Sequence, residues 1–124
     1  MVLKINKNTR FVVDLKIDIL SRLLYGLRID YSGTHYDAYA YNNETEQIVL
    51  RGSDCDILVN IEHVRLRPLL RRMSSMTDKE KIKYETLLAN AAADGEVWKV
   101  TDWLDRNMFD YRGLIDGGLA VEII

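Results

Sequence analysis

The spacing of apolar residues changes once along this chain, near Met76. Before that point they recur at every second residue, as at Leu27 and Ile29, and after it at every third or fourth, as at Tyr84 and Leu87. A period of two is typical of a strand with one buried face, and a period near 3.6 is typical of an amphipathic helix. The change therefore predicts an α+β fold in which strands pack on helices.

Four strands are expected in the first half, over residues 27–31, 34–41, 47–51 and 57–64. Ser32 and Gly33 form a two-residue reversal that favours a hairpin between the first two. Strict alternation places Tyr39 and Tyr41 together on the exposed face of the second strand. Short strands with tight connections predict an antiparallel meander, and they are compatible with a small barrel of SH3-like size.

A helix is expected before these strands, over residues 14–25. Leu15, Ile19 and Leu23 fall on one face at helical spacing, Asp14 is a suitable N-cap, and Gly26 is suited to close the helix. Residues 10–13 fit either a short extended piece or the first helical turn.

Two further helices and a short apolar tail are expected after Met76. Thr77 and Glu80 match the capping box, so a helix should begin there and end near Gly95. A second helix over residues 96–107 would bury Val97 and Leu104, among others. The tail ends in an alternating stretch, residues 119–123, that predicts a terminal strand docked on the sheet.

The length and composition favour one domain over residues 1–124, strand-rich at about 27–66 and helical at about 77–108. A chain of 124 residues with 48% hydrophobic and 29% charged content has room for one core. Residues 1–10 lack the continuous apolar stretch of a signal peptide, and the chain has no run long enough to cross a bilayer. We therefore expect a cytoplasmic protein with no membrane partner.

Two stretches resemble a family of small proteins carried by phages and prophages of gut Bacteroides-type bacteria. The first is Pro-Leu-Leu-Arg-Arg-Met-Ser-Ser-Met-Thr, at residues 68–77, which is similar to that family's linker before an acidic helix. Arg72 stands where relatives usually have a second proline. The second stretch is Phe-Asp-Tyr-Arg-Gly-Leu-Ile, at residues 109–115, which is similar to the family's carboxy-terminal signature.

The resemblance implies a shared fold and a phage or prophage setting in a bacterial host. The Leu-Tyr-Gly end of the first helix, residues 24–26, is also similar, with Leu24 where relatives often have proline. The family has no assigned reaction, ligand or partner, so the resemblance implies no mechanism.

The familiar catalytic patterns are missing from the sequence. It has no nucleophile elbow, no phosphate-binding glycine loop and no His-Glu-x-x-His helix. His35 and His63 have no cysteine or paired carboxylate at ligand spacing, and Cys55 stands alone between two aspartates. We therefore expect no catalytic residue, no metal, no cofactor and no enzymatic activity.

A basic cluster is the first candidate binding surface. With two exposed tyrosines of the strand region, it comprises Arg65, Arg67, Arg71, Arg72, Tyr39 and Tyr41. Arginine forks and aromatic rings are what a nucleic-acid groove needs. The alternative, which we favour, is that these arginines pair with the acidic second half of the chain. Residues 1–76 hold eleven Lys/Arg against nine Asp/Glu, a net charge of +2, and residues 77–124 hold six against ten, a net charge of −4.

Phe109, Tyr111 and Arg112 form the second candidate, a recognition loop. Tyrosine and arginine are common binding anchors. The same residues also suit a loop whose rings fill the gap between sheet and helices, and this packing is the interpretation that we favour. Arg112 is then expected to bind a carboxylate or a carbonyl.

The leading functional hypothesis is a non-enzymatic phage or mobile-element accessory protein that binds a host macromolecule. We expect the partner to be a host or phage protein. The alternative is a small nucleic-acid-binding module that uses the basic cluster. A homo-oligomer is left open, because an exposed edge strand can pair with a second copy.

Overall fold

The computed structural model describes the backbone of residues 7–123 and the side chains of residues 15–123. Within that part the chain forms three α-helices and a seven-stranded sheet. The helices are α1 (Lys7–Arg22), α2 (Asp78–Asp94) and α3 (Trp98–Arg106). The strands are β1 (Arg28–Tyr31), β2 (Thr34–Asn42), β3 (Gln47–Arg51), β4 (Ile57–Asn60), β5 (Leu66–Arg72), β6 (Phe109–Asp110) and β7 (Val121–Glu122). The α+β prediction is confirmed at this level.

The sheet is open, so the SH3-like barrel is wrong. Its strand order is β4-β3-β2-β1-β5-β6, and β7 also pairs with β5. The first four strands form the expected antiparallel meander, and β5 is antiparallel to β1, whereas β6 and β7 are parallel to β5. β1 pairs with the first half of β5, whereas β6 and β7 pair with its second half. The second half of β5 therefore extends beyond the meander, and the sheet does not close.

Residues 68–72 belong to strand β5, which corrects their interpretation as part of a linker. A proline inside a segment argues against a central strand, since it cannot donate to the ladder. Nevertheless Pro68 lies opposite Ile29, and Leu66 lies opposite Tyr31. Leu66 and Leu70 are fully buried in the core, which explains why the segment adopts an extended form.

A bulge in β2 corrects the predicted placement of Tyr41. The pairing with β3 shifts between Ala38, which faces Leu50, and Ala40, which faces Val49, so Tyr39 is the extra residue. A bulge reverses the alternation of every side chain that follows it. Tyr39 stays exposed, whereas Tyr41 is turned inward and packs against the core.

Helix α1 begins at Lys7, which corrects the expected start at Asp14. Asp14 therefore lies inside the helix and is not its N-cap. The turns from Leu15 onward pack against the core and nucleate the helix. Extending a nucleated helix costs little free energy, so residues 7–14 are helical as well. The predicted end is confirmed, since Gly26 is left-handed with φ 77° after a single 3-10 turn, Leu23–Tyr25. Residues 1–6, where no signal peptide was expected, lie outside the described residues.

The capping box of α2 is confirmed. The Glu80 amide donates to the Thr77 hydroxyl at 3.2 Å, and the Thr77 amide donates to the Glu80 carboxylate at 3.0 Å. Helix α3 buries Leu104 as expected, but Val97 precedes the helix and is exposed, which corrects the prediction that it is buried.

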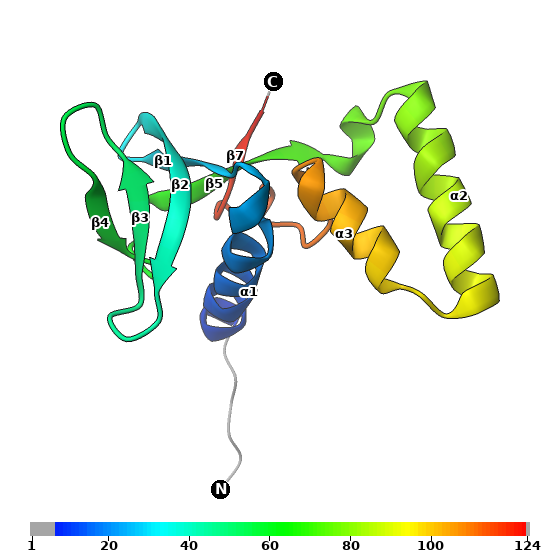
Figure 1. The fold of residues 1–124 in the computed structure, drawn as a ribbon, viewed down its shortest axis with the longest axis horizontal. Coiled ribbons are helices and arrows are strands. Elements are labelled where there is room, and N and C mark those ends of the chain that lie inside the picture. Colours follow the sequence, from blue (N-terminus) through cyan, green and yellow to red (C-terminus); the bar gives the residue numbers. More distant parts are fainter. Residues whose placement is uncertain (1–6, 124) are drawn as a thin grey trace, which may run out of the picture.

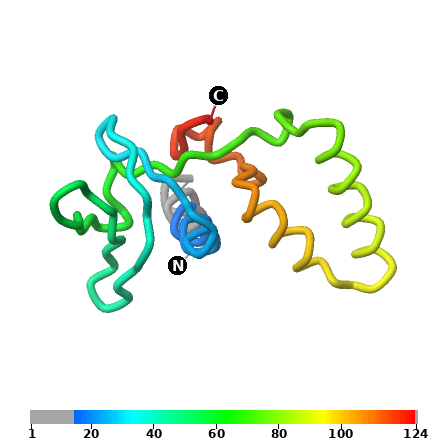
Figure 2. The backbone as a smooth tube through the Cα atoms, turned by 45° about the horizontal axis from the view of Figure 1, so that its top comes forward, coloured from blue at the N-terminus to red at the C-terminus, as the bar shows by residue number. Residues whose placement is uncertain are grey.

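The buried apolar residues form two clusters where the sequence suggested one core. The larger cluster lies between α1 and the sheet and includes Ile19, Ile29 and Leu70. The smaller one lies beneath α2 and α3 around Phe109 and Leu104. Figures 1 and 2 show α3 between α1 and α2, with α2 farthest from the strands. No described helix is long and apolar enough to cross a membrane.

Candidate functional site

An apolar cavity of about 420 Å³ opens beside the paired strands β5 and β7. We call this cavity the apolar pocket. Its apolar lining consists of Leu69, Met108, Val121 and Ile123. Leu69 pairs with Val121 across β5 and β7, and it points away from the core because its neighbour Leu70 points into it. Strand alternation therefore creates this second apolar face.

Two charged residues, Arg28 and Glu122, and the polar His35 also line this cavity and form its rim. The Glu122 carboxylate is bound by Arg72 at 3.1 Å. Arg28 approaches Asp37 only to 3.7 Å, and both side chains are exposed. A guanidinium has five N–H donors, so Arg28 keeps donors for a ligand at the rim.

Two arginines of the predicted basic cluster are bound to acidic residues of the second half. Arg71 makes a two-pronged contact with Glu80 at 2.8 and 2.9 Å, and its guanidinium lies 4.3 Å from the centre of the Phe109 ring. Arg72 binds Asp116 at 2.7 Å as well as Glu122. Hydrogen bonds from Arg71, then from the Thr77 amide, hold the pKa of Glu80 down at about 2.

The other predicted residues of this surface do not gather around the arginines. The Tyr39 hydroxyl donates to Asp56, and its ring lies under Arg51 with 4.9 Å from guanidinium carbon to ring centre. Tyr41 faces the core. Arg65 and Arg67 lie instead beside the turn between β1 and β2, at a separate cavity. The structure thus divides the six residues among four places.

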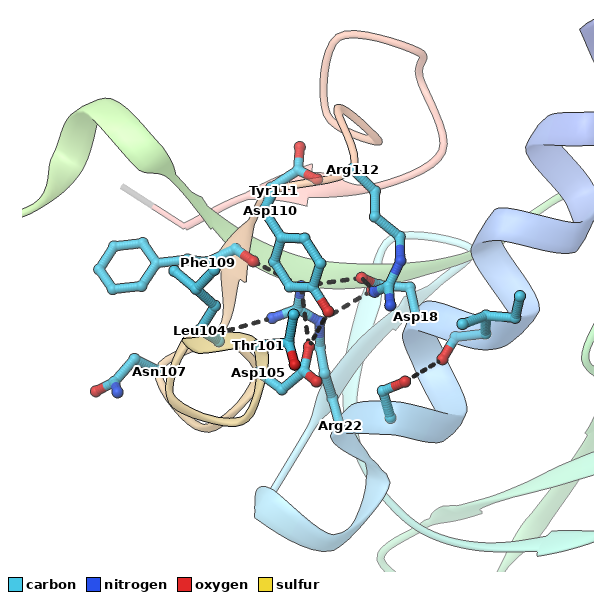
Figure 3. A network of polar contacts seen from close by, with 12 residues as sticks. Asp18, Arg22, Thr101, Leu104, Asp105, Asn107, Phe109, Asp110, Tyr111 and Arg112 are labelled. Carbon is cyan, nitrogen blue, oxygen red and sulfur yellow. Dashed lines mark hydrogen bonds and ion pairs between the residues drawn. The ribbon is translucent and has the colours of Figure 1, made fainter. Parts of the chain in front are cut away.

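The residues of the predicted recognition loop contact other parts of the chain, and Tyr111 and Arg112 are half-buried (Figure 3). Phe109 is fully buried in the smaller cluster. The Tyr111 hydroxyl donates to Asp105 at 2.8 Å, and Arg112 donates to Asp18 at 2.7 Å. Burial, followed by the bond to Asp105, raises the pKa of Tyr111 to about 12. These contacts correspond to the packing interpretation and to the expected binding of Arg112 to a carboxylate.

Arg22 is the centre of this polar network and is fully buried. It donates to both oxygens of Asp18, at 3.0 and 2.9 Å, and to the Phe109 carbonyl at 2.6 Å. A longer bond of 3.4 Å reaches the Leu104 carbonyl, and Asp105 lies 3.8 Å away. Arg22 therefore connects α1, which packs under the sheet, with α3 and β6.

The sequence interpretation missed this network, although a signal for it exists. Asp18 and Arg22 are spaced as an i,i+4 ion pair, and both fall within the apolar stripe that begins at Leu15 and Ile19. A charged pair on the buried face of a helix is expected to need further partners. The apolar pocket had no such signal, because its apolar lining comes from β5, the residue before β6, and the end of the chain at β7, which meet only in the folded protein.

The two histidines lie in separate places. His35 Nε2 is 3.4 Å from Asp30, whereas the His63 ring stands edge-on to Tyr31 with 5.3 Å between ring centres. Among the residues whose side chains are described, no group of three or more His, Cys, Asp or Glu could hold a metal ion.

Searches against protein-family models, curated proteins and solved structures find no match for this chain. The resemblance to phage and prophage proteins therefore stays a prediction from sequence.

Proposed function

We propose that this chain is a non-enzymatic accessory protein that binds a partner protein at the apolar pocket. The observation that carries the proposal is the pocket itself, an apolar concavity of about 420 Å³ with a charged rim. Such a cavity with a few polar groups is the usual form of a binding site. The partner supplies an apolar side chain, and a neighbouring carboxylate on the partner binds Arg28.

A protein partner is favoured because large apolar side chains are exposed in the lining of the cavity and in the turn just before Gly26. Ile123 lines the pocket and is still 42% exposed. Leu24, two residues before the lining residue Gly26, is 91% exposed. Large exposed apolar side chains around a cavity are typical of a protein contact surface. The resemblance to phage proteins makes a protein of the bacterial host the first partner to test.

The test combines affinity capture with matched variants. The tagged wild-type chain is used to capture a partner from a bacterial lysate, and the purified pair is then titrated. Ile123→Asp introduces a charge into the lining, and Arg28→Glu reverses the charge at the rim. Leu58→Asp is the control, because Leu58 is also an exposed apolar residue, 58% exposed against 42% for Ile123, and it lies on β4 at the other end of the sheet.

The proposal requires each pocket variant to weaken the purified complex at least about tenfold, which is 1.4 kcal/mol, while the control binds like wild type. A complex that all three variants form equally well contradicts it. Turnover of a substrate by the purified chain, with no stoichiometric partner, contradicts it as well.

A further inference from the structure

A second cavity, of about 380 Å³, lies at the turn between β1 and β2. We call this cavity the arginine pocket. It is lined by Ser32, Gly33, Val64, Arg65, Arg67 and Gly118. It shares no lining residue with the apolar pocket. Two arginines therefore line one polar cavity that the proposed function does not use.

The backbone holds both arginines in place. Arg67 belongs to β5 and pairs with Asp30 of β1. The Arg65 carbonyl accepts a hydrogen bond of 3.5 Å from the Ser32 amide, which ties the segment before β5 to the turn. Because the backbone is already fixed, ligand binding costs mainly the rotamer entropy of the two arginine side chains.

The positive charge of the arginine pocket is poorly compensated. Arg65 has no carboxylate within 4.0 Å among residues 15–123. Arg67 lies 4.0 Å from Asp30, a carboxylate that already accepts the Gly33 amide at 3.1 Å and lies 3.4 Å from His35. An anion in the cavity would thus find arginine donors that the protein itself leaves unused.

Single-phosphate recognition suits this arrangement better than recognition of a nucleic-acid strand. A strand needs a continuous basic track, and the next two arginines along β5, Arg71 and Arg72, are held by Glu80, Asp116 and Glu122. The fork of an arginine matches two oxygens of one phosphate. Gly33 and Gly118 present no side chains, and a Cβ atom at either would meet no protein atom within 4 Å.

We propose that the arginine pocket binds the phosphate group of a small phosphate monoester. Arg65 and Arg67 supply paired N–H donors, and the Ser32 hydroxyl supplies one more. The ligand is recognised by its phosphate, and the rest of the cavity accommodates the group that carries the phosphate.

The proposal is tested by nuclear magnetic resonance titration of the full chain at low salt. Adenosine 5′-monophosphate and inorganic phosphate should shift the amide signals of Gly33 and Gly118, and adenosine should not. Arg65→Ala should weaken binding at least about tenfold. Arg67→Lys should also weaken it, because it keeps the charge and loses the fork.

Arg51→Ala is the matched control, since Arg51 is an exposed strand arginine that lies over Tyr39, away from the arginine pocket. It should bind like wild type. Equal binding of inorganic phosphate and the nucleotide supports recognition of the phosphate alone.

Three results would overturn the proposal. The first is the absence of any amide shift at about 10 mM phosphate or nucleotide. That concentration is above the dissociation constant of about 1 mM expected for two such contacts. The second is binding that Arg65→Ala leaves unchanged. The third is preferential binding of a single-stranded oligonucleotide that weakens equally when Arg71 or Arg72 becomes alanine, which would indicate a nucleic-acid track instead.

Discussion

Arg22 of α1 donates a 2.6 Å hydrogen bond to the carbonyl of Phe109, eighty-seven residues further along the chain. Phe109 belongs to the smaller apolar cluster, whereas α1 packs in the larger one. This contact is therefore part of the connection between the two halves of the molecule (Figure 3).

Replacement of Arg22 by alanine should destabilise the protein strongly. It leaves the buried Asp18 carboxylate without its two-pronged partner and the Phe109 carbonyl without this donor. Breaking a buried ion pair typically costs about 3–5 kcal/mol. Urea unfolding of Arg22→Ala, with the exposed Arg106→Ala as control, measures the loss, and a cost below about 1 kcal/mol would show that Arg22 is not needed.

Glu80 should make stability depend on pH in the acid range. Its pKa in the folded protein is about 2, below the ordinary 4.5, chiefly through hydrogen bonding to Arg71. A carboxyl group with a lowered pKa stabilises the fold above its unfolded pKa, and that contribution is lost as the pH falls towards the folded one. Glu80→Gln should therefore be less stable than wild type at pH 7, and the difference should shrink as the pH falls from about 4.5 to about 2. A difference that is constant over this range contradicts the assignment.

Asp105 should give the stability of the fold the opposite dependence on pH. Burial raises its pKa above 3.8, against the bond from Tyr111 and the nearby charge of Arg22. A raised carboxyl pKa means that ionisation costs stability, so stability should decline as the pH rises through the pKa of Asp105. The decline should begin near the ordinary pKa of 3.8 and continue up to the raised one. Unfolding of Asp105→Asn, measured from pH 3.8 upward, should lack this decline. If the wild type and the variant show parallel pH profiles, Asp105 does not titrate as proposed.

Gly52 should not tolerate a side chain. A Cβ atom at this position would lie 2.1 Å from the backbone carbonyl oxygen of Cys55. Overpacking of this kind typically costs about 1–3 kcal/mol, because the loop between β3 and β4 must move. Thermal unfolding of Gly52→Ala, with the exposed Ser53→Ala as control, tests this, and equal melting temperatures would contradict it.

The sequence predicted features that depend on neighbouring residues. The capping box of Thr77 and Glu80, the Ser32-Gly33 hairpin and strand β3 are all confirmed. Each depends on local backbone chemistry, which a short stretch of sequence encodes.

The terminal strand docked on the sheet was predicted and is confirmed as β7, but other features that depend on long-range pairing were not predicted. The alternation in β2 gave no sign of the bulge at Tyr39, which turns Tyr41 inward, and Pro68 concealed strand β5. Pairing with other strands determines both the bulge in β2 and the extended form of β5. The apolar pocket was unpredictable for the same reason, since Leu69 and Val121 meet only when β7 docks on β5.

The most direct test of the proposed function is site-specific photocrosslinking from the rim of the apolar pocket. A photoreactive phenylalanine analogue replaces His35, which lines the cavity and is assigned no contact with the partner. In a control protein it replaces Arg51, which is exposed on β3 and lines neither pocket. We predict one crosslinked host protein from position 35 and none from position 51, with excess unlabelled wild type suppressing the product and excess Ile123→Asp failing to do so. Crosslinking from position 51 alone, or a product at position 35 that Ile123→Asp suppresses as well as wild type does, would contradict binding at the apolar pocket.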